Sequence, residues 1–420
     1  MASDKKIWIR YALANLFRNK RRSLYTILAI AMGYAAINVF GGFTSYIFTN
    51  LKDSSIYLAA GGHLSIFKKG FLTEGKIEPT KFLISDVELQ KITHLCNEVP
   101  GVKVTAPQLE IMGLISNGDI STIFIGIGTI PSKTKLIQES VTGMLSQLKL
   151  YDGEPLTDDF IYGSGITHGL ADKLGLDIGS GAIVMAPTVG GRINALDMEI
   201  RQKFHVAVEA LNDMIASIPL DFAQMLYDTD SVDRLSVLLS DDTLTLPVKH
   251  SLEQLFVENG LDMEIKTWEE MAPFYQKVKN MFDIIFLLIF IIVLTIAVTS
   301  IINTLSMTVM ERTREIGTLR ALGMKRSGVV TLFAIESALL GVAGSVAGVG
   351  ITLLAWFAVK VLDPQWMPPN IVAYIPLEVY LVPAYMAITL CFLVVLSIMA
   401  SIIPARRAAY SGIVDALGHV

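Results

Sequence analysis

Charged residues are scarce in this chain of 420 residues, and cysteine is nearly absent. Asp, Glu, Lys and Arg make up 17% of the residues, whereas 52% are hydrophobic and two are cysteines. Soluble globular proteins carry about 25% charged residues, so much of this chain has no water to face. Two cysteines exclude a disulfide scaffold. The composition therefore indicates a membrane protein.

The few charges are distributed unevenly along the chain. Residues 50–283 hold 19 Lys or Arg and 32 Asp or Glu, a net charge of −13, and the remaining residues sum to +8. Nucleic-acid binding needs a basic face, so we expect no nucleic-acid partner. An acidic middle between basic, apolar ends indicates one large aqueous domain attached to membrane segments.

Four long runs are apolar enough to cross a bilayer, whose core of about 30 Å needs roughly 20 apolar helical residues. They predict membrane-spanning helices over residues 24–49, 284–308, 329–360 and 379–404. The first run is too long for a cleaved signal peptide. Within residues 1–23, the segment 7–17 fits an amphipathic interfacial helix and an extension of the first span equally well.

The positions of Lys and Arg predict the orientation of these spans. Basic residues cluster before the first run, between the second and third runs (309–328), and after the fourth run (405–420), whereas the loop 361–378 has none. Basic residues are retained on the cytoplasmic side. We therefore expect both termini in the cytoplasm, with residues 50–283 and 361–378 outside it.

Residues 50–283 are long enough to form a hydrophobic core of their own. Alternating patterns predict strands over 63–67, 111–116, 122–127, 183–186, 204–208 and 235–239, and helices over 86–98, 165–174 and 246–259. We expect an α+β domain of two lobes, with an insertion over about 115–210, and a helix over 273–282 that continues into the second span. The predicted fold class is a polytopic α-helical membrane protein of four transmembrane helices, with this large α+β extracytoplasmic domain inserted between helices 1 and 2.

The sequence shows no arrangement of residues typical of an active site. Residues 70–76 have the spacing of a phosphate-binding loop, but Ile77 replaces the hydroxyl that would hold Mg²⁺. The six histidines are scattered singly, without metal-ligand spacing. We therefore predict that the chain is not an enzyme and binds no cofactor or metal.

Polar and small residues inside the spans are the remaining candidates for function. Glu336 either pairs across an interface between membrane subunits and responds to their movement, or it lies near the cytoplasmic interface, where it snorkels or pairs with Arg326 or Arg320. Small residues of the third span and a polar residue of the second permit close packing within the bundle or across a dimer. These residues are Gly341, Gly344, Gly348 and Asn303.

The loop between the second and third spans contains the sequence ERTREIGTLRALG over residues 311–323. Its apolar positions fall at helical spacing among charges, which predicts a short amphipathic helix able to dock into a groove of a soluble partner. The sequence closely resembles the coupling helix of permeases in the MacB, LolC/LolE and FtsX group, the type VII ABC transporters. The resemblance assigns ATPase coupling to Glu311, Arg312, Arg314, Glu315, Gly317, Arg320 and Gly323.

The resemblance covers nearly the whole chain. Residues 14–22, Asn303-Thr304, Glu336-Ser337, 404–409 and 415–417 are similar to residues typical of the group, and 284–420 is similar to its FtsX-like permease domain. Residues 50–283 take the place of the MacB-like periplasmic core domain. Within them, residues 169–176 and 194–197 resemble the lipoprotein-releasing LolC/LolE branch.

The resemblance implies a permease subunit of a bacterial inner membrane, in contact with membrane lipids. ATP and Mg²⁺ would be bound by a separate cytoplasmic ABC ATPase, and a second permease chain would complete a homodimer or heterodimer. The group works by mechanotransmission, here to extract lipoproteins or a related lipidic cargo from the outer leaflet for a periplasmic carrier or adaptor. Two alternatives are a MacB-like exporter of peptides or small molecules and an FtsX-like signalling device that transports nothing.

Overall fold

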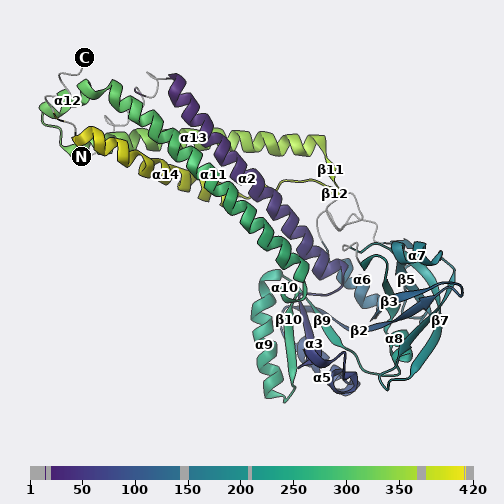
Figure 1. Ribbon diagram of the computed structural model, residues 1–420. Helices are drawn as coiled ribbons and strands as arrows, with labels where there is room; N and C mark the ends of the chain where they lie inside the picture. Colours follow the sequence, from purple (N-terminus) through teal and green to yellow (C-terminus); the bar gives the residue numbers. More distant parts are fainter. Residues whose placement is uncertain are drawn as a thin grey trace. The chain divides into compact units, whose positions relative to one another are not determined.

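The computed structural model describes Asn15 and residues 20–141, 151–206, 211–366, 375–410 and 412. The chain divides into two compact units (Figure 1). A helical unit comprises Met1–Ile47, Val278–Pro364 and Pro376–Val420, and a strand-bearing unit comprises Phe48–Lys277 and Gln365–Ile375.

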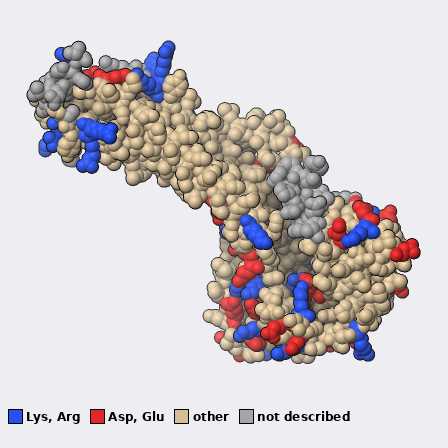
Figure 2. Space-filling view, viewed as in Figure 1, with Lys and Arg blue, Asp and Glu red and all other residues tan. Residues whose placement is uncertain are grey.

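Among the described residues, the helical unit contains four helices that are long and apolar enough to cross a membrane. They are α2 (Lys20–Asp53), α11 (Pro273–Glu311), α13 (Arg326–Leu362) and α14 (Pro383–Tyr410). Figure 2 shows that the visible surface of this unit is largely uncharged, with its charges gathered at the end where α12 (Thr313–Ala321) lies. An apolar lateral surface is what a hydrocarbon environment requires.

The four helices are longer than the predicted spans. The helix predicted over 273–282 does continue without a break into the second span as α11. The tail predicted from 405 begins later, because α14 continues to Tyr410. Most of the predicted N-terminal helix (1–14 and 16–19), residues 367–374 of the loop 361–378, and residues 411 and 413–420 of the tail lie outside the described residues.

The strand-bearing unit is built on one sheet. Among the described residues its strands are β1 (Leu64–Lys68), β2 (Val102–Ser116), β3 (Ser121–Thr129), β4 (Tyr151–Gly153), β5 (Gly163–Thr167), β6 (Gly181–Pro187), β7 (Ile193–Phe204), β8 (Ile215–Pro219), β9 (Arg234–Leu239) and β10 (Met263–Thr267). Their order is β10-β1-β9-β2-β3-β8-β5-β7-β4, with β6 pairing with β2 and β7. A separate pair, β11 (Gln365–Trp366) and β12 (Ile375–Pro376), forms a second small sheet.

Several short helices accompany the sheet. They are a π-helix η1 (Ser54–Leu58), α3 (Phe71–Glu74), α4 (Pro79–Phe82), α5 (Asp86–Glu98), α6 (Pro131–Gln138), α7 (His168–Leu174), α8 (Leu220–Tyr227), a 3₁₀ turn η4 (Asp242–Leu244), α9 (Thr245–Glu258) and α10 (Trp268–Met271). The helix predicted over 86–98 is confirmed as α5, whose capping box links Ser85 and Glu88. The strand predicted over 204–208 is wrong in its described part, because Phe204 ends β7, a strand that begins at Ile193, and residues 205 and 206 belong to no strand; residues 207–208 are not described.

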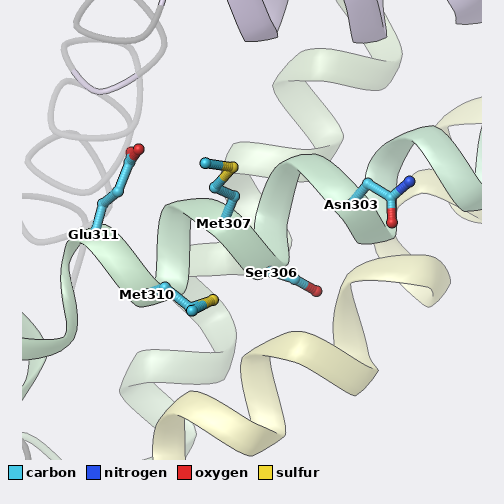
Figure 3. Close-up of a pocket in the computed structure, with 5 residues that line it drawn as sticks. All are labelled: Asn303, Ser306, Met307, Met310 and Glu311. Atoms are coloured by element: carbon cyan, nitrogen blue, oxygen red, sulfur yellow. The ribbon is translucent and has the colours of Figure 1, made fainter.

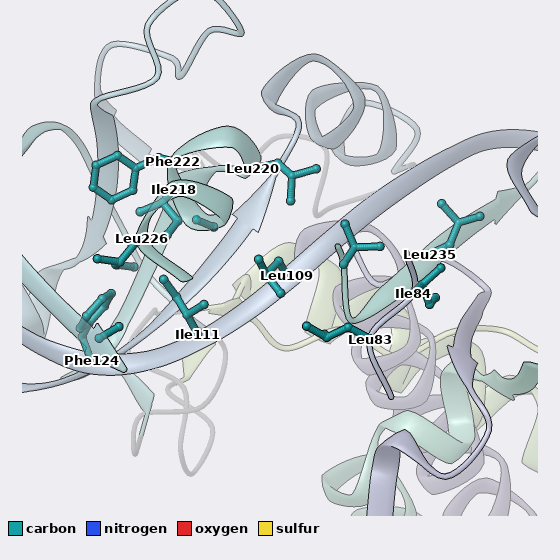
Figure 4. Packing of buried hydrophobic residues seen from close by; sticks show 14 of the residues in the cluster. Leu83, Ile84, Leu109, Ile111, Phe124, Ile218, Leu220, Phe222, Leu226 and Leu235 are labelled. Carbon is teal, nitrogen blue, oxygen red and sulfur yellow. The ribbon is translucent and has the colours of Figure 1, made fainter. Parts of the chain in front are cut away.

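One long strand and one hydrophobic core run through both parts of the domain that the sequence divides into lobes. The first half of β2 pairs with β9 and its second half with β3, and Gln108 has a partner on each. Figure 4 shows Phe222 of α8 among the labelled side chains of this core, which also includes Ile111, Phe124 and Ile218. The predicted insertion over 115–210, of which 142–150 and 207–210 are not described, therefore shares its core with the rest of the sheet.

Candidate coupling site

Helix α12 is a separate short helix because the chain leaves helical geometry on both sides of it. At Arg312 the backbone has φ −110° and ψ 13°, which ends α11 and caps α12. At the other end Gly323 has φ +102°. The N–H of Gly323 donates to the carbonyl of Arg320 at 3.1 Å and that of Met324 to Leu319 at 3.0 Å, which is the Schellman arrangement.

One side of α12 is buried within the helical unit. Ile316 is 3% exposed and belongs to a hydrophobic cluster that includes Phe333 of α13 and Ala405 of α14. Gly317 is also buried. This apolar side fixes the rotation of α12 about its own axis, because turning it would expose Ile316.

A buried ion pair anchors the start of α12 to α13. The Nη1 of Arg312 lies 2.9 Å from Oε1 of Glu336, and the side chains are 7% and 4% exposed. The Nε of Arg312 lies 2.9 Å from Oε2 of Glu315. The amide Nδ2 of Asn15 donates to the same Glu336 oxygen at 2.6 Å. These partners allow two charges to be buried, which is costly for charges that lack them.

The partner of Glu336 differs from the two that the sequence suggests. Arg326 instead has its guanidinium carbon 4.5 Å from the ring centroid of Tyr410, and Arg320 is half-buried in the last turn of α12. The pairing of Glu336 with Arg312 places a buried guanidinium at the break between α11 and α12. The sequence signals that Glu336 needs a partner, but several basic residues of the loop satisfy that condition equally well.

The other side of α12 is open. Arg314, Thr318 and Leu322 are exposed, Leu322 at 81%. At the end of α11, Glu311 is exposed and forms an ion pair of 2.5 Å with Arg22, an exposed pair that contributes little to stability. Of the seven residues assigned to coupling, Glu311, Arg314 and Gly323 are exposed, Glu315 and Arg320 are half-buried, and Arg312 and Gly317 are buried.

The glycines of α13 lie where neighbouring helices of the same chain approach closely. A Cβ at Gly344 would lie 2.6 Å from Cβ of Ile30, and one at Gly348 would lie 2.6 Å from Cβ of Tyr34, both on α2. A Cβ at Gly341 would lie 2.7 Å from Oγ of Ser397 on α14. These glycines permit a three-helix contact within the bundle.

Asn303 is exposed on α11 and lines a groove of about 590 Å³. Figure 3 shows that its lining side chains project from successive turns of this one helix, and they are Asn303, Ser306, Met307, Met310 and Glu311.

The next residue of α11, Thr304, makes a polar contact between helices that the sequence analysis did not predict. Its Oγ1 lies 2.6 Å from Oγ1 of Thr26 on α2. Pairs of hydroxyls between helices are common where lipid offers no partner.

Helix α12 therefore has one fixed side and one open side. Among the described residues, no group of three or more His, Cys, Asp or Glu side chains is placed to hold a metal ion. The buried side of α12 is fixed by an apolar contact and by the Arg312–Glu336 pair, and its open side presents Arg314 and Leu322.

Comparison with known proteins identifies the class. Residues 287–413 match the FtsX-like permease C-terminal family. The chain is 24% identical over 361 residues to the lipoprotein-releasing system transmembrane protein LolC of Neisseria meningitidis, covering 80% of this chain and 82% of LolC. It is 22% identical over 359 residues to the uncharacterized ABC transporter permease YknZ of Bacillus subtilis, covering 82% and 84%. It is 25% identical over 221 residues to the macrolide export ATP-binding/permease protein MacB of Photorhabdus laumondii, covering 50% of this chain but 31% of MacB.

Residues 287–413 therefore form an FtsX-like permease domain, and the chain as a whole is similar to permeases of type VII ABC transporters. It is homologous to LolC, MacB and YknZ, as its coupling-loop sequence predicts.

Proposed function

We propose that this chain is the transmembrane subunit of an ATP-driven transporter and that a separate cytoplasmic ABC ATPase, which binds ATP and Mg²⁺, docks on the open side of α12. The observation that carries the proposal is the division of α12 into a fixed side and an open side. Arg312 and Ile316 hold the helix in the bundle, so a force applied at Arg314 or Leu322 moves α12 together with α13. Docking on a loosely held loop would transmit no movement.

Helix α11 supplies the path of transmission. It is one helix from Pro273, in the strand-bearing unit, to Glu311, one residue before Arg312. Because a helix of this length is stiff along its axis, displacement at α12 is passed toward the strand-bearing unit. We propose that α12 and both termini face the cytoplasm and that the strand-bearing unit is periplasmic, in agreement with the distribution of Lys and Arg.

We further propose that two permease chains and a periplasmic carrier or adaptor complete the transporter, and that its cargo is a lipoprotein or a related lipidic molecule. The support for this cargo is the similarity to LolC, which extends over 80% of the chain. The match to the macrolide export protein MacB covers half of the chain.

Tagged purification from native membranes in mild detergent tests the assembly. We expect an ATPase dimer with two permease chains by native mass. Arg314→Glu should lower ATPase recovery at least ten-fold, because it reverses a charge on the open side of α12. Arg192→Glu is the matched control, since Arg192 is 83% exposed in the strand-bearing unit. Equal ATPase recovery with both variants would contradict docking at α12.

Reconstituted proteoliposomes test the cargo. We expect ATP-dependent release of a fluorescent diacylated lipopeptide to a soluble acceptor, and no ATP-dependent movement of a fluorescent macrolide. Release of the macrolide alone would favour the exporter alternative, and an ATPase-bound complex that moves neither probe would favour a signalling device.

A further inference from the structure

The last turn of α2 is joined to the sheet by a chain of polar side chains. Lys52 forms an ion pair with Asp242 of η4. The Oδ1 of Asp242 lies 2.8 Å from Nε2 of His63, a residue directly before β1 whose side chain is fully buried. All three residues belong to the strand-bearing unit. We call this chain of contacts the Lys52–Asp242–His63 relay.

The hydrogen bonds of His63 define its tautomer. The backbone N–H of Leu239 donates to Nδ1 of His63 at 3.1 Å. A ring nitrogen that accepts a hydrogen bond carries no proton, so the proton of the neutral imidazole is on Nε2. That Nε2–H donates to Asp242, which must be ionised to accept from His63 and Lys52 together. These hydrogen bonds, with that from His63 the largest cause, lower the pKa of Asp242 to about 2.

The backbone of His63 connects the relay to the first turns of α11. Its N–H donates to the carbonyl of Val237 on β9 at 2.8 Å, and its carbonyl accepts from the N–H of Trp268 at 3.0 Å. The ring centroid of Trp268 lies 4.9 Å from that of Tyr275 on α11, and the ring centroid of Tyr275 lies 5.9 Å from that of Phe48 on α2. His63 therefore stands between the ends of both helices and the sheet.

The segment between α2 and β1 continues the helix as the π-helix Ser54–Leu58 and then turns at Ala60, which has φ +52°. Single π-helical turns are rare and recur at functional sites. Ile56 and Ala60 belong to a small buried cluster that also includes Ala106 of β2 and Leu238 of β9. The relay is a second, polar connection between α2 and the sheet beside this packing.

We propose that Asp242 and His63 are positioning residues that fasten α2 to the sheet, so that movement of this membrane helix reaches the outer domain. This inference rests on the proposed function, because it takes the ATPase as the source of the movement. The relay bypasses residues 54–62 and joins Lys52 directly to the strands that His63 contacts.

Two substitutions interrupt the relay from opposite sides. Asp242→Asn keeps an acceptor for the Nε2–H of His63 but places an amide N–H₂ or a neutral oxygen toward Lys52. Lys52→Met keeps the apolar stem of the side chain and removes the charge. Asp262→Asn is the matched control, because the Asp262 carboxylate is 78% exposed and lies 3.6 Å from Lys69, away from the relay.

Hydrogen exchange on the full chain in detergent, without the ATPase, tests the fastening itself. We expect amide exchange over residues 54–62 to rise at least ten-fold in Asp242→Asn and in Lys52→Met and to stay at the wild-type rate in Asp262→Asn. Wild-type exchange in both relay variants would overturn the proposal. This readout does not depend on transport, so it is independent of the proposed function.

The ATPase-bound complex in nanodiscs tests the transmission. A spin label at Val257→Cys on α9, a position 79% exposed, reports the distance between two outer domains once the exposed Cys391 is replaced by serine. We expect ATP with vanadate to shift this distance in the wild type. The shift should be at least halved in both relay variants, with ATP turnover within about two-fold of wild type. A full shift in the variants would overturn the transmitting role, and a wild type without any shift would overturn the proposed function.

Discussion

The buried Arg312–Glu336 ion pair should contribute far more to the stability of the chain than an exposed residue of the same helix. Replacing Arg312 by Met leaves the Glu336 carboxylate 4% exposed with Asn15 as its described hydrogen-bond donor. Loss of one partner from a buried pair costs about 3–5 kcal/mol. Glu336→Gln should lower the free energy of unfolding by less, about 1–3 kcal/mol, because Arg312 keeps its contact with Glu315 at 2.9 Å.

The double variant Arg312→Met with Glu336→Met should be close to the wild type in stability. Both charges are then removed, and apolar side chains of similar length fill the site, an exchange that is often neutral or stabilising. Together with the single variants Arg312→Met and Glu336→Met, it forms a double-mutant cycle in which the coupling energy is about 3 kcal/mol or more. Arg314→Met is the control, since Arg314 is exposed on the same helix, and it should change stability by no more than about 0.5 kcal/mol.

Thermal unfolding of the purified chain in one detergent measures these differences. A loss of 3–5 kcal/mol lowers Tm by on the order of 10 °C, at about 2–4 °C per kcal/mol. The reasoning would be refuted by equal Tm losses for Arg312→Met and Arg314→Met. It would also be refuted by a double variant whose loss equals the sum of the two single losses.

Three further predictions concern other parts of the chain. Burial raises the pKa of Asp233 to about 6, so the folded state binds this proton more tightly than the unfolded state. The free energy of unfolding should therefore fall by about 3 kcal/mol as the pH rises from about 4 to 6, and it should stay constant above pH 6. In a series of Tm measurements at different pH values, Asp233→Asn should abolish this dependence. Gly344→Ala should lower the free energy of unfolding by about 1–3 kcal/mol, because the added Cβ would clash with Ile30. Gly350→Ala should not lower it, since a Cβ added there meets no neighbouring element within 4 Å. Equal Tm losses for the two variants would contradict the packing of Gly344. Gly323→Ala should cost about 1–2 kcal/mol, because φ is +102° there, and an unchanged Tm would argue against the left-handed cap.

The positions of the long helices and the amphipathic coupling loop could be predicted from local patterns. A span is recognised by its own apolar length, and α5 by its capping sequence Ser85 to Glu88. Strand β7 was missed because most of its side chains are exposed or half-buried and many are polar. Its pairing with β5 and β6 supplies the regularity that the sequence lacks.

The sequence by itself determined the class of the protein, because hydropathy, charge sign and the motif over residues 311–323 are properties of contiguous residues. Only the tertiary structure decided which basic residue meets Glu336, and that Asn15, more than 300 residues away in sequence, donates to the same carboxylate. It also decided that His63, Asp242 and Lys52 lie together. Contacts of this kind depend on how helices turn and pack. The side chains that make them have equally suitable competitors in the sequence, and only the folded geometry distinguishes between them.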